Sequence, residues 1–148
     1  MRQAALALLT VLVLAACGGG GGGSSRLSKS EFDAKANAVC DKYEKKIKAV
    51  PQPSGTKDIV SYIDKVLPIL DEGTGKLDEL NPPKDIESTV DEWRSIQHQE
   101  VDEAKKLKEA AQKGDLAEVT KIAGETAASN KRGNQLALQI GATTCAAD

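Results

Sequence analysis

Aromatic side chains are scarce in this chain, whose 148 residues include one Trp, two Tyr and one Phe. So few rings do not make a base-stacking surface or an aromatic platform for a sugar. Basic side chains do not cluster either, and 20 Lys and Arg residues stand against 22 Asp and Glu residues. The sequence therefore disfavours binding to nucleic acid, and binding to anionic lipid through a polybasic patch.

Histidine and methionine are almost absent, since His98 is the only histidine and Met1 the only methionine. A haem bundle needs axial ligands and usually a Cys-x-x-Cys-His motif, and a di-iron bundle needs Glu-x-x-His on two helices. Ser95 precedes His98 by three residues, but no orienting carboxylate or oxyanion donor accompanies the pair. We therefore predict no enzyme, no cofactor and no metal site, with His98 on the surface or hydrogen-bonded.

The densest charge lies between Asp91 and Glu103, where five acidic residues precede three nearby lysines. The acidic residues are Asp91, Glu92, Glu100, Asp102 and Glu103. We interpret this stretch as a solvated helix face, and a weak cation site on the surface is the alternative.

The N-terminus carries an apolar run, Ala4 to Leu14, after the positive charge of Arg2. About 11 residues are too few to cross a ~30 Å hydrocarbon core as a helix, but they suit a signal peptide. The run ends in Leu14-Ala15-Ala16-Cys17, which resembles the lipobox of bacterial lipoproteins. The resemblance implies that the Cys17 thiol takes a diacylglycerol group and that the signal peptide is cleaved before Cys17.

These signals divide the chain into three parts. Residues 1–16 are the predicted signal peptide, and residues 17–25 are the lipidated cysteine with a Gly/Ser linker that has nothing to pack. Residues 26–148 are expected to form one domain, held by its lipid at the cell membrane or outer envelope on the extracytoplasmic side. Cleavage removes Arg2 and leaves 19 basic residues against 22 acidic ones, a net charge of −3.

Cys40 and Cys145 remain after lipidation uses Cys17. Exported proteins fold in an oxidising compartment, so we expect these two cysteines to form a disulfide. Two unpaired buried thiols are the alternative. Metal binding by two thiolates without Cys-x-x-Cys spacing is less favoured.

Apolar residues recur at helical spacing along the mature chain, and no segment alternates as a strand would. Capping and breaking residues bound four helical segments, approximately 28–50, 56–80, 82–114 and 115–141. Ser28 and Glu31 form a capping box at the first start. Thr56 is the expected cap of the second segment, where Pro68 should kink the helix. Gly73 and Gly75 weaken this helix further, so two shorter helices are the alternative. Short connections then predict an all-α fold, an antiparallel (up-down-up-down) four-helix bundle with a kinked second helix. A three-helix core with a detached hairpin is the alternative.

The mature chain also resembles small helical lipoproteins of actinobacteria. The shared features are Ala38-Val39-Cys40, the Pro82-Pro83 pair ahead of Trp93, and Gly-Ala-Thr-Thr-Cys at residues 141–145. That group has no established activity, so the resemblance implies an origin and no mechanism.

Gln97 occupies a core position on the third predicted helix. If residues are counted in equal numbers on either side of the loop before this helix, Pro68 lies at the same level of the bundle as Gln97. The same count on the other two helices places Cys40 and Gly133 near that level. In one interpretation the Gln97 amide donates to the Asp64 carbonyl that Pro68 leaves without a partner, and the layer is solid. In the other, the kink and Gly133 leave a cavity, with Gln97 as its polar group.

Two functions remain open at this point. The first is a non-enzymatic envelope or interaction lipoprotein that presents its surface to another envelope protein. The alternative is a ligand-binding lipoprotein that holds a small apolar molecule between helices near Pro68 and Gln97.

Membrane attachment is expected to depend on Cys17 alone, because no other segment is long and apolar enough to hold the domain. A Cys17→Ala variant with an alternative cleavage site should release the mature domain into the soluble fraction. Fractionation of cells that express either form measures this. A variant domain that still pellets with membranes would show a second anchor.

Overall fold

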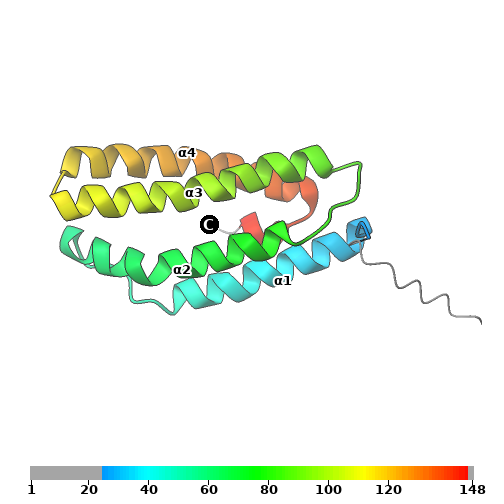
Figure 1. Ribbon diagram of the computed structural model, residues 1–148, viewed down its shortest axis with the longest axis horizontal. Helices are drawn as coiled ribbons and strands as arrows, with labels where there is room; N and C mark the ends of the chain where they lie inside the picture. The colour runs from blue at the N-terminus through cyan, green and yellow to red at the C-terminus, as the bar shows by residue number, and fades with distance from the viewer. Residues whose placement is uncertain (1–24, 147–148) are drawn as a thin grey trace, which may run out of the picture.

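The computed structural model describes residues 25–146, which form an antiparallel four-helix bundle (Figure 1). The elements are α1 (Lys29–Lys48), the 3₁₀ turn η1 (Thr56–Asp58), α2 (Ile59–Asp78), α3 (Glu87–Lys113), α4 (Leu116–Ile140) and the 3₁₀ turn η2 (Thr143–Ala146). Residues 25–146 contain no strand, so the all-α prediction is confirmed. The predictions for Cys17 and the signal peptide lie outside the described residues. Within the described part, no helix is both long and apolar enough to span a membrane.

Helix ends follow the local signals closely. The Ser28 side chain accepts a hydrogen bond from the Glu31 N–H, and the Ser28 N–H donates to the Glu31 carboxylate at 2.8 Å. Asp115 accepts from the Glu118 N–H at 3.0 Å and so caps α4. Gly114 and Gly141 end α3 and α4 at positive φ, which glycine adopts without a Cβ clash.

Three details of the helix prediction are wrong. Thr56 is not a cap, because η1 comes first and α2 starts at Ile59. The alternative of two shorter helices in the second segment does not hold, since α2 continues through Pro68, Gly73 and Gly75 as one helix. The third helix starts at Glu87 and not at the proline pair, because tertiary hydrogen bonds hold the backbone of residues 81–82 along the start of α1.

The C-terminal tail turns back at Gly141 and lies between α1 and α4, where it contacts both helices. The Asn37 side chain donates to the Gly141 carbonyl at 2.9 Å and accepts from the Thr144 N–H at 2.6 Å. This brings Cys145 to Cys40, and the disulfide between them is present, as predicted. Within the tail, residues Thr143–Ala146 form the η2 turn.

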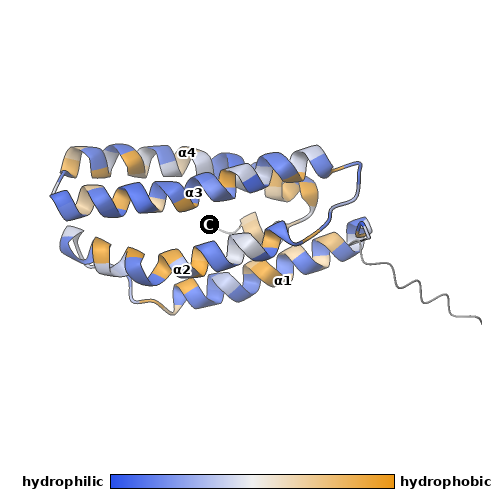
Figure 2. Cartoon of the chain, in the orientation of Figure 1, coloured by the Kyte–Doolittle hydropathy of each residue, from blue (hydrophilic) through white to orange (hydrophobic). Residues whose placement is uncertain are grey.

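The main hydrophobic core lies at the end of the bundle where the tail turns back. Its buried members are Phe32, Ala36, Leu77, Val90, Trp93, Leu136, Ala137, Ile140 and Ala142. Figure 2 shows the alternation of hydrophobic and hydrophilic residues along the helices that makes each of them amphipathic. At the opposite end α1 stops short of the other three helices (Figure 1).

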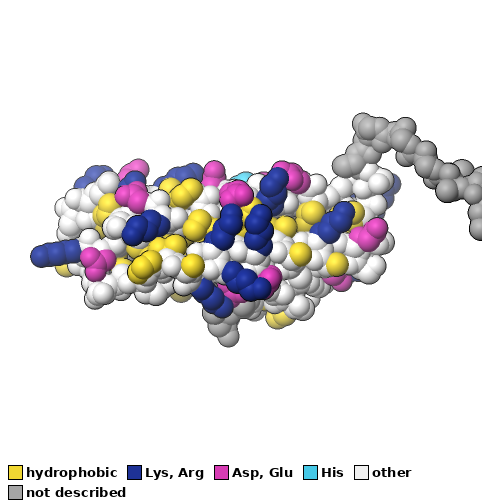
Figure 3. Space-filling view, turned by 90° about the horizontal axis from the view of Figure 1, so that it is seen from below, with side chains coloured by type: hydrophobic (Ala, Val, Ile, Leu, Met, Phe, Trp, Pro, Cys, Tyr) yellow, Lys and Arg dark blue, Asp and Glu magenta, His cyan; other side chains and the backbone are white. Residues whose placement is uncertain are grey.

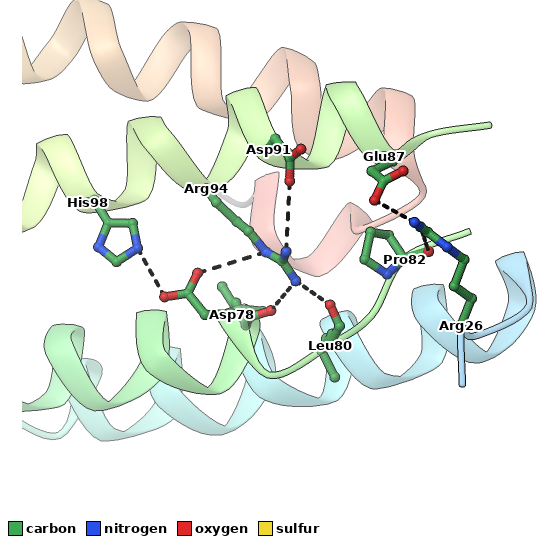
Figure 4. A network of polar contacts seen from close by, with 9 residues as sticks. Arg26, Asp78, Leu80, Pro82, Glu87, Asp91, Arg94 and His98 are labelled. Carbon is green, nitrogen blue, oxygen red and sulfur yellow. Dashed lines mark hydrogen bonds and ion pairs between the residues drawn. The ribbon is translucent and has the colours of Figure 1, made fainter. Parts of the chain in front are cut away.

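Arg94 joins α3 to the carboxyl end of α2 (Figure 4). Its Nη2 donates to the Leu77 carbonyl at 2.7 Å and also to the Leu80 carbonyl, so it adds a side-chain donor to carbonyls at the end of α2. One turn further on, His98 Nε2 lies 3.0 Å from Asp78. The beginning of α3 therefore projects beyond the end of α2. The predicted register of α3 on α2, which assumed equal numbers of residues on either side of the loop, is wrong.

The disulfide closes a loop of 105 residues, for which chain entropy gives a stabilisation of ~4.7 kcal/mol. The double variant Cys40→Ala/Cys145→Ala should therefore lose about 2–5 kcal/mol of unfolding free energy. Urea denaturation measures the loss, with the reduced wild-type protein as its matched control. Two free thiols in the exported, unreduced protein would contradict the bond.

Candidate binding cavity

A cavity of about 310 Å³ lies between α1 and α2, with η2 at one side and one side chain of α3. Its lining residues are Val39, Cys40, Tyr43, Glu44, Ile47, Lys48, Ile69, Leu70, Gly73, Thr74, Leu77, Gln97, Thr144 and Cys145. Most of these side chains are apolar. Its size falls at the lower end of the range for sites that hold small molecules.

The contact of Tyr43 with Gly73 fixes how closely α1 and α2 approach beside the cavity. A Cβ at Gly73 would lie 3.0 Å from Tyr43 Cγ, so the ring packs directly on the α2 backbone. The tail closes another side through Thr144 and Cys145, and the disulfide is therefore part of the wall. The cavity depends on the same tail contacts that hold the fold together.

Gln97 is the α3 residue of the wall. Its amide has no hydrogen bond to another described residue, and no bond joins it to the Asp64 carbonyl. Gly133 of α4 packs behind it, since a Cβ there would lie 3.6 Å from Gln97 Nε2. The structure thus brings Gln97, Gly133 and Cys40 together as the sequence predicted, although Gly133 does not line the cavity.

The prediction that Pro68 lies beside Gln97 is wrong. Pro68 is exposed and is not part of the cavity wall. The pairing of His98 with Asp78, and of Lys108 with Asp64, shifts α3 along α2 so that Pro68 lies closer to the level of Lys105. The cavity does not arise from a kink at this proline.

A pair of carboxylates lies next to Gln97 along α3. Glu103 is only 4% exposed, and its Oε1 accepts from Gln99 at 2.7 Å and from Ser129 of α4 at 3.0 Å. Its buried Oε2 has no hydrogen-bond partner among the described residues. A Cβ at Gly133 would lie 3.5 Å from Glu100 Oε1, so Glu100 faces the α3–α4 contact as well.

The expectation of a fully solvated acidic face is therefore corrected at two positions. Asp91, Glu92 and Asp102 are exposed, but Glu103 is buried and Glu100 is half-buried. Ile96, Glu100, Glu103 and Leu107 follow one another at steps of four, three and four residues, which places them on one face of the helix. This periodicity is the signal in the sequence for the burial of the two glutamates.

His98 is exposed and pairs with Asp78 on the bundle surface, in agreement with the sequence interpretation. Ser95 is exposed and makes no hydrogen bond with it. Within residues 25–146, no three His, Cys, Asp or Glu side chains are grouped as they would be around a metal ion.

Comparisons of the chain with protein-family models, curated proteins and solved structures found no match. Function is therefore inferred from the cavity and its neighbouring charges.

Stability should depend on pH through Glu100. Burial, with a smaller contribution from the Glu103 carboxylate, raises the pKa of Glu100 from 4.5 to about 7. The folded protein then binds a proton that the unfolded chain releases between those pH values, so stability falls as pH rises through that window.

The unfolding free energy of the wild type should accordingly decrease between pH 5 and pH 8, and the Glu100→Gln variant should lose this part of the decrease. Chemical denaturation across the range measures both proteins. The exposed Glu109, on the same helix, supplies the control Glu109→Gln. Equal slopes for Glu100→Gln and the wild type would show that Glu100 titrates normally.

Proposed function

We propose that this chain is a lipid-anchored, extracytoplasmic binding protein without enzymatic activity, whose bundle holds a small apolar molecule in the α1–α2 cavity. The observation that carries the proposal is a largely apolar lining to which Gln97, the residue that α3 contributes, adds an amide without a hydrogen bond to another described residue. Cavities that bind small molecules combine these two features, because apolar walls favour transfer from water and a polar group orients the ligand.

The size of the cavity limits what it holds. A volume of about 310 Å³ accommodates roughly ten groups the size of a water molecule. A chain of eight carbon atoms with a polar end is of that order. Larger lipids would need the helices to separate.

Membrane attachment is part of the proposal on the grounds of the Leu14-Ala15-Ala16-Cys17 motif. The described chain enters the bundle beside the α2–α3 connection. There Arg26 donates to the Pro82 carbonyl at 3.0 Å and pairs with Glu87 at 2.7 Å (Figure 4). The linker would therefore join the domain at the end of the bundle that carries the main core.

Binding of another envelope protein is the second candidate, favoured by two exposed leucines on α4. Leu116 and Leu138 are each 59% exposed. They are 22 positions apart, or about 33 Å along a helix, and so do not form one patch. On the face that Figure 3 shows, acidic and basic side chains are intermingled with hydrophobic ones. The cavity is the better supported of the two sites.

Gln97→Leu tests the proposal. Because the Gln97 amide has no hydrogen bond to lose, the unfolding free energy should stay unchanged or rise when Leu replaces it. Uptake of octan-1-ol, measured by calorimetry, should be abolished. A loss of ~1–3 kcal/mol would instead indicate a structural hydrogen bond.

The matched control is Gln135→Leu, which makes the same replacement at an exposed position of α4 outside the cavity wall. It should bind octan-1-ol as the wild type does. Native mass spectrometry of the protein extracted from its own membranes would identify the resident molecule. No binding of octan-1-ol or of any other eight-carbon amphipathic molecule by the wild type would contradict the proposed function.

A further inference from the structure

Glu100 and Glu103, which follow the cavity residue Gln97 along α3 and face α4, have no positive partner within the described chain. No Lys, Arg or His lies within ion-pair distance of Glu100 or Glu103, although fourteen ion pairs occur elsewhere in the described bundle. The charge that acts on Glu100 is that of Glu103, which has the same sign. A buried carboxylate without a counter-ion is unfavourable, so this region would gain from a cation.

The neighbouring helices do not supply that cation. On α2, Asp78 is paired with His98 and Asp64 with Lys108. From α4, Ser129 and Gly133 face the two carboxylates, and both are uncharged. On α1, Lys48 is paired with Glu44 within the cavity wall, and so contributes little net charge.

Gln97 connects the cavity to these carboxylates. It lines the cavity, and Glu100 follows it by three residues on the same face of α3, a separation of about 5–6 Å between Cβ atoms. The Gln97 Nε2 and Glu100 Oε1 atoms both border the Gly133 backbone. A ligand end that contacts Gln97 therefore lies one helical turn from a carboxylate without a cation.

We propose that the ligand of the cavity is an amphipathic molecule with a protonated amine, whose apolar body fills the space between α1 and α2 and whose ammonium group lies at Gln97, where Glu100 balances its charge. This inference rests on the proposed function and specifies the chemical class of the ligand. The N–H groups of an ammonium suit the Gln97 carbonyl, and the Glu100 carboxylate, which does not line the cavity, acts on the ammonium charge from one helical turn away. A carboxylate in the same place would be repelled by Glu100 and Glu103.

The test compares octylamine, octan-1-ol and octanoate, which share an apolar chain and differ in the polar end. Calorimetry at pH 8, where Glu100 is ionised and octylamine is protonated, should give octylamine an affinity at least about tenfold above that of octan-1-ol. Octanoate should bind more weakly than either. Lowering the pH to 6 should reduce the affinity for octylamine and leave that for octan-1-ol unchanged, because the pKa of Glu100 is about 7.

Glu100→Gln should bring the affinities for octylamine and octan-1-ol together, while the Glu109→Gln control keeps the preference for the amine. Thermal unfolding followed by circular dichroism confirms that each variant folds. Equal binding of octylamine and octan-1-ol by the wild type would overturn this inference and leave the proposed function intact, as would a preference for the amine that survives Glu100→Gln. Failure of all three probes to bind would count against the proposed function itself.

Discussion

The return of the C-terminal tail between α1 and α4 is the constraint on which the other features depend. Gly141 reverses the chain at a positive φ, in a place where a Cβ would lie 2.6 Å from the Asp33 carboxylate. The Asn37 side chain then holds the tail at two points, and the Cys40–Cys145 bond fixes it covalently. The tail separates two helices that a closed bundle would bring into contact. The same short segment supplies one side of the cavity through Thr144 and Cys145, so the fold and the candidate site share one support.

Local features of the fold could be predicted because they depend on nearby residues. The capping box at Ser28 and the glycine at each of two helix ends act within one turn, and the sequence shows them directly. The register of α3 on α2 could not be predicted, because it is set by Arg94 reaching the carbonyls of Leu77 and Leu80. No local pattern distinguishes an arginine that caps a neighbouring helix from one exposed to solvent.

The candidate site was predictable to a similar degree. Gln97 stood out as a polar residue on an apolar stripe, and the structure places it in the cavity wall. The cavity itself follows from the position of the tail and from the Tyr43–Gly73 contact, which join segments distant in sequence. Pro68 was misplaced because the count assumed a symmetric hairpin. Glu103 is buried, although the sequence interpretation placed it on a solvated face because it is charged. The helical periodicity of its position favoured burial instead.

Burial of Glu100 and Glu103 costs stability, and the disulfide compensates for that cost. Two carboxylates in a packed helix contact destabilise a domain whose described part buries only three aromatic side chains, Phe32, Tyr43 and Trp93. Hydrogen bonds from Gln99 and Ser129 compensate one oxygen of Glu103 and leave the other without a partner. The disulfide restricts the unfolded chain and so offsets this cost without filling the cavity. A bundle selected for stability alone would place apolar residues at both positions, and the retained carboxylates are consistent with a charge that serves binding.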